Sequence, residues 1–544
     1  MDPEESAAQN WGSCPLHSRE GEHIMSIFFF TLGRVEPEAA RSPRGGRQGG
    51  RYPNSTHGPK REMRGTEGQM TAMAIHEECG VFGIYDPAGG CAQSTYYGLY
   101  ALQHRGQEAC GIAAMNGMEL RCHKDVGLVG DVFSKEILDR LDGTMAVGHV
   151  RYSTTGGSLR ENAQPLTLSY VKGTFAVAHN GNLVNVEQLR RYYEYRGAIF
   201  HTSTDSEIIS YLIAQERLRC SSIEQAVANT IRQLRGAFSL VVMSSRKLIA
   251  ARDPWGFRPL CVGRRGDAWI FASESCALDS VGATFVRDVE PGEVVYVDLK
   301  GELRSIRDCC GTLRTGLCIF EFLYFARPDS VIDGQWVHDA RILAGRYLAR
   351  EHPRQADVVI GVPDSGLNAA KGYAMESGIP YNDGLIKNRY VGRTFIKPDQ
   401  ASREQAVKLK LNPLRSTIDG KRVVVIDDSI VRGTTSSQLV RLLRDAGAKE
   451  VHMLSSAPMF LAPCYFGTDI PSRKELMACN HTLEEMRQII GADTLGFLSV
   501  DSLGRIAPDC RCGFCTGCFT QHYPIPIDRE ESQYRTKDMC RITK

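Results

Sequence analysis

One cysteine, Cys79, begins the first strand-like part of the chain, "CGVFGIYD", directly after a leader rich in glycine and arginine. A thiol becomes a good nucleophile only when a base or a positive field helps to remove its proton. A residue at the start of a chain carries its own base, because the α-amino group has a pKa of about 7.7–8.0. The sequence therefore suggests that the chain is cut directly before Cys79. The alternative is that Cys79 is one more buried cysteine of a strand.

Two later segments, "GHVRYSTTG" and "AHNGNL", each end a β-rich run in polar, turn-prone residues, where a site can lie. Arg151 in the first can bind a carboxylate through two hydrogen bonds. Asn180 and the backbone amide of Gly181 in the second can donate to a developing oxyanion. Asp205, in "TSTDSE", can bind an ammonium group. Each residue alone has a structural explanation, as a surface arginine, a turn asparagine or a helix-capping aspartate, but the ordered set favours a site.

These segments, together with "ALQHRGQEACGI", resemble in their order the class II, or N-terminal nucleophile, glutamine amidotransferases. The resemblance implies hydrolysis of glutamine to glutamate and ammonia by an α+β fold, the four-layer αββα sandwich. It makes Cys79 the nucleophile and Asn180 and Gly181 the oxyanion hole. Arg151 and Asp205 would bind the carboxylate and the amino group of glutamine. Members with a propeptide have far fewer residues there than the 78 of this chain, so we expect a misplaced start.

A second site is indicated by "VVVIDDSIVRGTT", a strand that ends in Asp427 and Asp428 and continues into a loop of small, hydroxylated and glycine residues. The backbone amides of such a loop can surround a phosphate, and the start of the following helix adds its dipole. The two carboxylates can bind ribose hydroxyls or a hydrated Mg²⁺. The alternative is an acidic strand end followed by a capped helix without a ligand.

This segment resembles the substrate loop of the type I phosphoribosyltransferases, which are α/β proteins with a parallel sheet. "GVPDSG" resembles their pyrophosphate-side loop, and "KNRYVGRTF" resembles the mobile loop that closes over the substrate. The resemblance implies that Ser365, Asp427 and Asp428 lie at a Mg²⁺ ion. The residues that it assigns to binding of 5-phosphoribosyl 1-pyrophosphate are Lys387, Arg389, Asp427, Asp428, Ser429, Arg432, Gly433, Thr434 and Thr435.

Four cysteines crowd into "CRCGFCTGC" near the end of the chain. The spacing of Cys515 and Cys518 lets one turn present two thiolates to a single metal centre, such as an iron–sulfur cluster. On spacing alone a tetrahedral zinc site is the strongest rival, and a pair of inert buried thiols is the third interpretation. Cys510 and Cys512 are close enough in sequence to compete as ligands.

The two sites together resemble the amidophosphoribosyltransferase family, with "CIFEFLYFARPDS" joining the domains. The resemblance implies that glutamine, water and 5-phosphoribosyl 1-pyrophosphate become 5-phosphoribosylamine, glutamate and pyrophosphate, the first committed step of purine synthesis. Ammonia would pass through the interior between the sites. One Mg²⁺ per subunit, a homotetramer and feedback inhibition by purine nucleotides are also implied.

Within this family, "LCIFEF", "APCYFG" and "CTGCFT" match the branch that carries an iron–sulfur cluster. The resemblance implies one [4Fe–4S] cluster per subunit with a structural role. Its four ligands would be Cys318, Cys464, Cys515 and Cys518.

Changes in composition and pattern divide the chain into four expected parts. Residues 1–78 are a leader that is disordered or removed, 79–312 a glutaminase domain, 313–480 a phosphoribosyltransferase domain with its linker, and 481–544 a helical tail with the cysteines. Strand-like runs alternate with turns in the second part. That part is also expected to contain a helix over 93–104.

Strand–helix alternation, which is typical of a parallel sheet, begins near residue 335. We expect strands over 356–363, 421–428 and "EVHMLSSAP", and a helix over 436–447 whose leucines recur at helical spacing.

Charge, hydropathy and cysteine content exclude several classes of protein. The net charge of +2 provides no broad basic field for nucleic acid, and no apolar run approaches the ~18–20 residues that cross a bilayer. Eighteen cysteines spread over 544 residues are typical of a reducing compartment, so we expect the cytoplasm. The motifs leave two alternative functions: a different class II amidotransferase, and a non-catalytic regulator that senses phosphoribosyl pyrophosphate.

Overall fold

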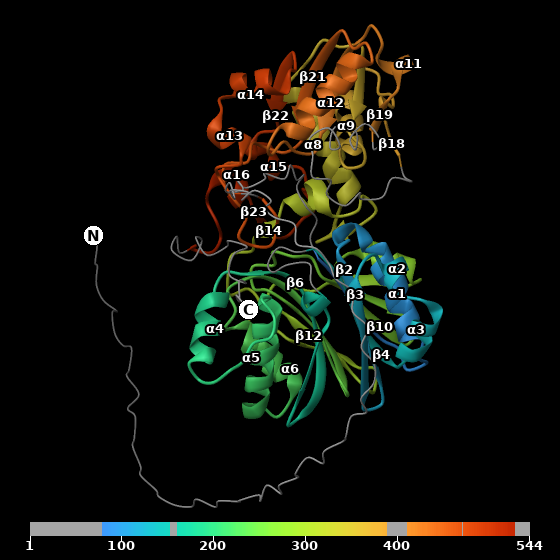
Figure 1. Ribbon diagram of the computed structural model, residues 1–544, viewed down its shortest axis with the longest axis vertical. Coiled ribbons are helices and arrows are strands. Elements are labelled where there is room, and N and C mark those ends of the chain that lie inside the picture. Colours follow the sequence, from blue (N-terminus) through green and yellow to red (C-terminus); the bar gives the residue numbers. More distant parts are fainter. Residues whose placement is uncertain (1–78, 153–159, 389–410, 471, 528–544) are drawn as a thin grey trace, which may run out of the picture. The chain divides into compact units, whose positions relative to one another are not determined.

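The computed structural model describes residues 79–152, 160–388, 411–470 and 472–527, which are drawn in colour in Figure 1. The expected leader, residues 1–78, lies outside the described residues. In the described part, no helix is both long enough and apolar enough to cross a membrane.

The first half of the described chain contains two antiparallel sheets. The order of the seven strands in the first sheet is β11 (Thr284–Asp288), β9 (Cys261–Arg265), β10 (Ala268–Ala272), β1 (Gly80–Tyr85), β4 (Met145–Arg151), β2 (Ala109–Asn116) and β3 (Glu119–Val126). The order of the six strands in the second is β13 (Leu303–Ile306), β12 (Val294–Asp298), β8 (Lys247–Arg252), β7 (Gly236–Ser244), β6 (Gly173–Leu183) and β5 (Leu166–Tyr170).

All six residues of β1 are buried, because both faces of its sheet are covered. Val81 and Tyr85 pack into the core between the two sheets, with Ala178 of β6 and Val241 of β7. Side chains alternate along a strand, and Phe82 therefore packs into a second core on the other face. A strand that is buried on both faces is apolar throughout, as "GVFGIY" is.

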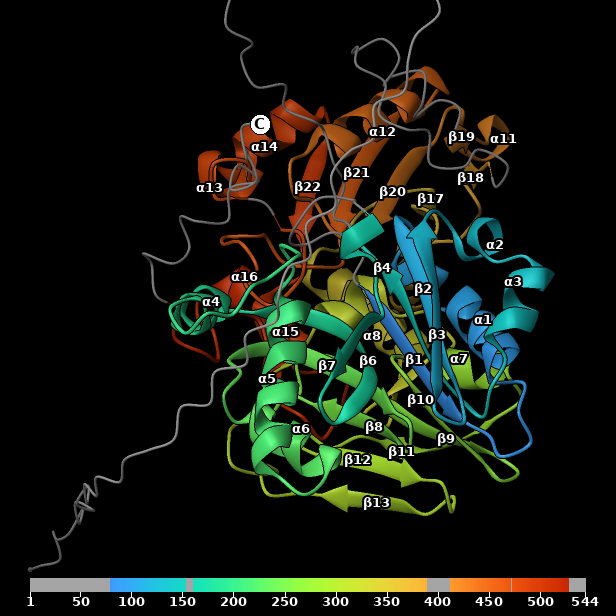
Figure 2. The same cartoon turned by 60° about the horizontal axis from the view of Figure 1, so that its bottom comes forward.

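Helices cover the outer face of each sheet, as Figure 2 shows. On the first sheet lie α1 (Cys91–Ala101), α2 (Val129–Val132), α3 (Lys135–Leu141) and α7 (Ser275–Ser280). On the second lie α4 (Val186–Glu194), α5 (Asp205–Arg219) and α6 (Ile223–Ile231). The predicted four-layer αββα sandwich is therefore confirmed. The helix that we expected over 93–104 begins and ends slightly earlier, as α1, and a short 3-10 turn follows at Gln103–Arg105.

The second half is built on a parallel sheet with the order β17 (Val358–Gly361), β20 (Arg422–Asp427), β21 (Glu450–Ser455) and β22 (Thr494–Phe497). Along β20, Val423 and Val425 pack into one core while Val424 and Ile426 pack into another. Both faces of the sheet are thus buried, as parallel sheets require.

The helices around this sheet are α8 (Val337–Glu351), α9 (Gly366–Ser377), α11 (Arg415–Ile418), α12 (Thr434–Asp445), α13 (Met477–Asn480), α14 (Leu483–Ile490), α15 (Val500–Leu503) and α16 (Gly517–Thr520). The helix that we expected over 436–447 is α12, which begins and ends two residues earlier. The three predicted strands are present, and β22 adds a fourth. Because β22 pairs with β21, the sheet extends past residue 480 into the segment that we expected to form a separate tail.

The linker between the halves pairs with the cysteine-rich tail. Strand β14 (Leu317–Cys318) lies parallel to β23 (Phe514–Cys515), so Cys318 is opposite Cys515. A π-helical segment, η3 (Glu321–Phe325), follows β14. Two further short pairs are β15 (Val331–Ile332) with β16 (Gln335–Trp336), and β18 (Leu385–Lys387) with β19 (Leu411–Pro413).

Helices α8 and α9 cross in close backbone contact, which two glycines permit. A Cβ atom on Gly345 of α8 would lie 1.9 Å from the carbonyl oxygen of Ala369. A Cβ atom on Gly372 of α9 would lie 2.0 Å from the carbonyl oxygen of Ile342. Neither backbone oxygen can move without displacing its helix, so both positions require glycine.

We expect Gly345→Ala to lower the midpoint of thermal unfolding, because overpacking of this kind costs about 1–3 kcal/mol. If the half that contains α8 and α9 unfolds as a unit of about 150–250 residues, each kcal/mol corresponds to about 2–4 °C. Gly504→Ala is the matched control, because a Cβ atom there meets no atom within 4 Å and the φ angle is −66°. Equal midpoints for the two variants would contradict the proposed backbone contact.

Candidate active sites

Cys79 lies directly before β1, beside the end of β4. Gly80 of β1 pairs with Val150 of β4, and the thiol of Cys79 donates to the carbonyl oxygen of Tyr152 at 3.4 Å. Arg151, the last residue of β4, is only 3 % exposed. The sequence-predicted nucleophile and the predicted carboxylate-binding arginine are therefore neighbours on adjacent strands.

Asn180 and Gly181 lie near the end of β6, in the facing sheet. The side chain of Asn180 is buried, and its Nδ2 has no hydrogen-bond partner among the described residues. A buried donor without a partner costs about 1–3 kcal/mol, so its retention points to an acceptor that a ligand supplies. Gly181 has a φ of 139°, and a Cβ atom there would lie 2.1 Å from the carbonyl oxygen of Ala237. This conformation suits the predicted oxyanion hole and requires glycine.

A buried hydrogen bond connects the two strand ends. Nε2 of His149, two residues before Arg151, lies 3.0 Å from the carbonyl oxygen of His179, the residue before Asn180. Burial lowers the pKa of His149 to about 3, so this imidazole is neutral at physiological pH. Cys79, Arg151 and Asn180 therefore belong to the same end of the sandwich. Both histidines lie within the predicted motifs, but we did not single them out, because only the tertiary contact reveals their role.

Asp205 begins α5 and contacts the same end of β6. Its Oδ2 accepts from the backbone N–H of Leu183 at 3.1 Å, and its Oδ1 lies 3.5 Å from Nδ1 of His179. Burial opposes ionisation of this carboxyl group, but the charge and hydrogen bond of His179 and the Leu183 amide outweigh burial and lower its pKa. Asp205 therefore keeps its negative charge at neutral pH and can bind an ammonium group.

Asp427 and Asp428 lie at the carboxyl end of β20, as predicted, and each is 8 % exposed. Ser365, which precedes α9 on the neighbouring strand's loop, donates through its hydroxyl to Oδ2 of Asp428. Ser429 donates to Oδ1 of the same carboxylate at 2.5 Å. The three predicted metal-site residues therefore meet at one edge of the parallel sheet.

Both carboxyl groups of this pair have a raised pKa. Burial is the main cause for each, and the charge of Asp428 raises the pKa of Asp427 further. Hydrogen bonds from Ser365 and Ser429 and the charge of Arg341 oppose the shift at Asp428. Two buried, adjacent carboxylates favour a bound cation, which would relieve both the burial penalty and the repulsion.

The loop after this pair leads into α12 through Gly433, whose φ of 76° is left-handed. This backbone conformation favours glycine, and a Cβ atom on Gly433 would in addition lie 2.3 Å from Sδ of Met477. Thr434 and Thr435 form the first turn of α12, where the helix dipole favours an anion. The start of α12 can therefore accept a phosphate, as the sequence predicts.

Two of the remaining predicted phosphate-binding residues are paired with carboxylates. Arg432 forms an ion pair with Glu475, with 2.8 Å between Nη2 and Oε2. Lys387, at the end of β18, contacts Asp364 of the "GVPDSG" loop. Arg389 lies outside the described residues.

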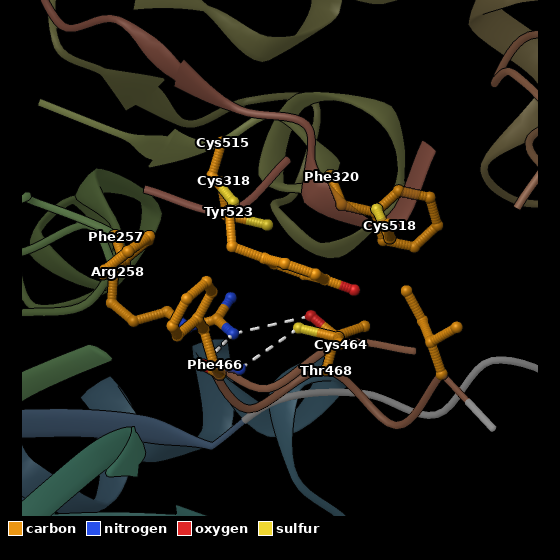
Figure 3. A pocket seen from close by; sticks show the side chains of 11 residues that line it. Phe257, Arg258, Cys318, Phe320, Cys464, Phe466, Thr468, Cys515, Cys518 and Tyr523 are labelled. Carbon is orange, nitrogen blue, oxygen red and sulfur yellow. Dashed lines mark hydrogen bonds between the residues drawn. The ribbon is translucent and has the colours of Figure 1, made fainter. Parts of the chain in front are cut away.

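Four cysteines from three separate segments of the chain line one small cavity, shown in Figure 3. They are Cys318 of β14, Cys464, Cys515 of β23 and Cys518 of α16. Burial and the proximity of the other three thiols raise the pKa of Cys518 well above its usual value. The backbone N–H of Phe466 donates to the sulfur of Cys464 at 3.3 Å, an interaction that favours a thiolate.

Cys510 and Cys512 do not line this cavity. The thiol of Cys510 donates to Oδ2 of Asp333 at 3.1 Å, and the backbone N–H of Cys512 donates to the same oxygen at 2.6 Å. Burial raises the pKa of Cys512 to about 11 and that of Cys510 further. Both thiols are therefore protonated, and Asp333 holds the thiol of Cys510 and the backbone of Cys512 outside the cavity of the other four.

Within the described ranges, no three His, Cys, Asp or Glu side chains lie close enough together to hold a single metal ion. A tetrahedral zinc site would require such a set, with Zn–S distances of about 2.3 Å.

Comparison with protein families assigns both halves. Residues 149–280 match the glutamine amidotransferase domain, and residues 337–457 match the phosphoribosyl transferase domain. Each of the two sites described above overlaps one of these ranges.

Two relatives that match most of the chain have the same name. The amidophosphoribosyltransferase of Bacillus subtilis is 50% identical over 458 residues, which cover 83% of this chain and 95% of the relative. That of Methanocaldococcus jannaschii is 48% identical over 468 residues, covering 83% and 99%. The solved structure of the B. subtilis glutamine phosphoribosylpyrophosphate amidotransferase, complexed with ADP and GMP, is 49% identical with a TM-score of 0.76 and covers 83% of this chain and 98% of that one.

At about pH 8 and without metal, we expect the double variant Asp427→Asn, Asp428→Asn to have a higher melting midpoint than the unaltered protein. A carboxyl group whose folded-state pKa is raised destabilises the fold as pH rises above its ordinary value, and neutral amides remove this penalty. Added Mg²⁺ should then raise the melting midpoint of the unaltered protein only. Binding of magnesium phosphoribosyl pyrophosphate, measured by calorimetry, should also fall in the variant. Equal stabilisation of both proteins by Mg²⁺ would contradict the assignment.

Proposed function

The chain belongs to the amidophosphoribosyltransferase family and is therefore a glutamine-dependent pentosyltransferase of the first step of purine synthesis, and we propose that its two sites divide this reaction between them. The glutaminase half would release ammonia from glutamine. The phosphoribosyltransferase half would transfer that ammonia to C1 of 5-phosphoribosyl 1-pyrophosphate. The observation that carries the division is the presence of one polar site at a strand end in each half.

In the glutaminase half, removal of residues 1–78 would free the α-amino group of Cys79. This amine takes the thiol proton, and the sulfur bonds to the amide carbon of glutamine. Nδ2 of Asn180, which has no other partner among the described residues, and the N–H of Gly181 donate to the oxyanion. The C–N bond then breaks, the proton leaves with ammonia, and water hydrolyses the thioester to glutamate. Arg151 and Asp205 hold the ends of the substrate.

In the second half, the backbone amides of the loop before α12 and the dipole of that helix would bind a phosphate of the substrate. Asp427, Asp428 and Ser365 would hold Mg²⁺, which supplies positive charge to the departing pyrophosphate. Ammonia bonds to C1 as the bond from C1 to the pyrophosphate oxygen breaks. No side chain acts as a nucleophile, so positioning and electrostatics carry the catalysis.

A route for ammonia through the interior is supported by the buried helix η3. Its first residue, Glu321, contacts Arg105, which donates to the carbonyl of Cys79. At its other end, Arg341 donates to the carbonyl oxygen of Tyr324 and lies near enough to Asp428 to influence its pKa. The linker therefore reaches from the first site to the second.

We also propose that Cys318, Cys464, Cys515 and Cys518 hold a [4Fe–4S] cluster. The donor set fits, because the four cysteines line a common cavity and an eight-atom cluster separates its ligands more widely than a single zinc ion does. When bound, the cluster would supply four iron–sulfur bonds that join the linker, the Cys464 segment and the tail. Its role would be structural.

We also propose how the protein is regulated and assembled. A relative of known structure is described as complexed with ADP and GMP, and we propose that purine nucleotides inhibit this chain as well. A homotetramer, one Mg²⁺ and one cluster per subunit, and a cytoplasmic location follow from the family resemblance.

Cys79→Ser tests the division of the reaction. We expect glutamine-dependent synthesis of phosphoribosylamine to be lost, because serine is a far weaker nucleophile than a thiolate, while synthesis from added ammonia continues. Both rates are measured on the same folded preparation. Loss of both activities would show that the two sites are not separate.

Anaerobic purification tests the cluster. We expect brown protein with about four irons and four sulfides per chain, and exposure to oxygen should bleach it. Cys464→Ser should lower the iron content and the soluble yield. Cys512→Ser is the matched control and should change neither, since its backbone is held by Asp333 outside the cavity. Stoichiometric zinc without sulfide would refute the proposal.

A further inference from the structure

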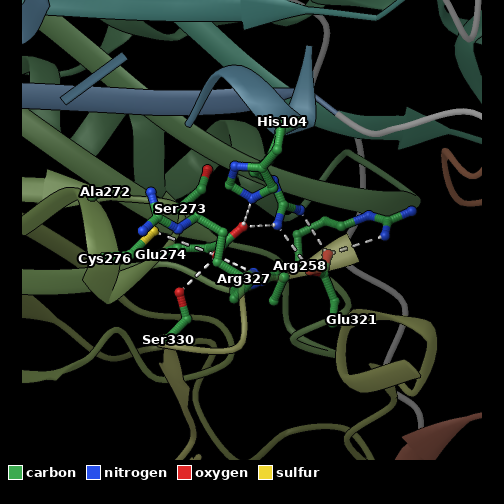
Figure 4. A network of polar contacts seen from close by, with 12 residues as sticks. His104, Arg258, Ala272, Ser273, Glu274, Cys276, Glu321, Arg327 and Ser330 are labelled. Carbon is green, nitrogen blue, oxygen red and sulfur yellow. Dashed lines mark hydrogen bonds and ion pairs between the residues drawn. The ribbon is translucent and has the colours of Figure 1, made fainter. Parts of the chain in front are cut away.

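A buried network of charges lies between the glutaminase half and the linker, as Figure 4 shows. Arg105 donates through Nη1 to Glu274 at 2.6 Å and through Nη1 and Nη2 to Glu321 at 2.9 and 2.8 Å. Arg258 adds a longer contact to Glu321, at 3.5 Å. The four side chains are at most 1 % exposed.

The network reaches the nucleophile. Nε of Arg105 donates to the carbonyl oxygen of Cys79 at 3.1 Å. Once Cys79 is the first residue of the chain, no preceding peptide bond holds it. The contacts that then orient it include β1, the contact of its thiol with Tyr152 and this hydrogen bond.

The network also reaches the segment that follows Cys464. Nη2 of Arg258 donates to the carbonyl oxygen of Phe466 at 2.6 Å. The same segment also contacts β6, the strand that carries Asn180 and Gly181. Nδ2 of Asn182 on this strand donates to the carbonyl oxygen of Tyr465 at 2.9 Å. A Cβ atom on Gly467 would lie 3.4 Å from Cα of Gly181. Residues 464–468 therefore support both the nucleophile, through Arg258, and the oxyanion hole.

A network of this kind is poorly explained by stability. The desolvation penalty of burying two arginines and two glutamates offsets much of their electrostatic attraction. Apolar residues of similar volume often stabilise a core as well or better. Charged pairs with several fixed hydrogen bonds do, however, define one geometry, because a guanidinium group presents its donors in a rigid fork. The benefit of this network is the fixed position of Cys79.

We propose that Glu321 and Arg105 are positioning residues for glutamine hydrolysis, which hold Cys79 through its carbonyl group. The inference rests on the proposed role of Cys79 as the nucleophile. Glu321 comes from the linker, 216 positions after Arg105, so the glutaminase site is complete only when the linker is docked. The glutaminase half on its own lacks this acceptor.

Glu321→Gln in the full-length, mature protein is the test. The amide keeps the volume and one acceptor but removes the charge that pairs with Arg105. We expect kcat for glutamine hydrolysis to fall about 10- to 100-fold, as misplacement of a reacting group by about 1 Å does. The KM for glutamine should change little, because Arg151 and Asp205 remain. Ammonia-dependent synthesis should also remain.

Glu293→Gln is the matched control. Glu293 is also buried and accepts two hydrogen bonds from Arg287, at 2.7 and 2.8 Å, but that pair does not contact Cys79. It should lower thermal stability without changing the ratio of glutamine- to ammonia-dependent rates. If Glu321→Gln does not fold, Arg105→Lys takes its place, because lysine keeps the charge but cannot contact both glutamates and the Cys79 carbonyl at once.

Equal loss of both activities, or no loss of either, in the folded variant would overturn the inference. These outcomes are distinct from failure of the proposed function, which Cys79→Ser reports separately in the same assays. A changed KM with an unchanged kcat would also overturn it, since that result would place Glu321 in substrate binding.

Discussion

The pairing of Arg105 and Arg258 with Glu274 and Glu321, inside the protein, is the interaction on which the arrangement of the two halves depends. Charges in such a place must be matched, because a single unpaired one would be strongly destabilising. The linker can therefore dock only where Glu321 meets both arginines. Once it is docked, β14 is placed beside β23, and Cys318 is opposite Cys515. The position of the cysteine cavity follows from that pairing.

Both candidate sites lie at the ends of buried strands. The strands that carry them are buried on both faces, so polar groups can be placed only where a strand ends. Asn180 lies near the end of β6 and Asp427 at the end of β20. Each site contains a buried polar group that the described protein only partly stabilises. In the first site this is the amide of Asn180, and in the second it is the adjacent carboxylates. Each feature suits the ligand that we propose for its site.

The sequence predicted the two fold classes and the places of most candidate residues at strand ends, because these depend on short segments. A strand followed by a glycine turn and a helix is encoded locally, and "VVVIDDSIVRGTT" carries all three parts. Helix ends were less accurate, as the shift of α12 by two residues shows. Strand β22 was missed because its four residues, "TLGF", are too few to show a period. Only its pairing with β21 reveals it as part of the sheet.

The sequence by itself determined which chemical groups this protein has: a thiol at the start of a strand, an amide and a glycine at a strand end, and an acidic pair before a phosphate loop. Such groups are recognisable because their function depends on neighbours within a few residues. The tertiary structure alone decided how the groups are held. It separated Cys510 and Cys512 from the cavity by giving them Asp333 as a partner. It also joined Glu321 to Arg105 over a separation of 216 positions. No local pattern encodes a contact of that range, because it exists only after separate elements have packed and excluded water from between them.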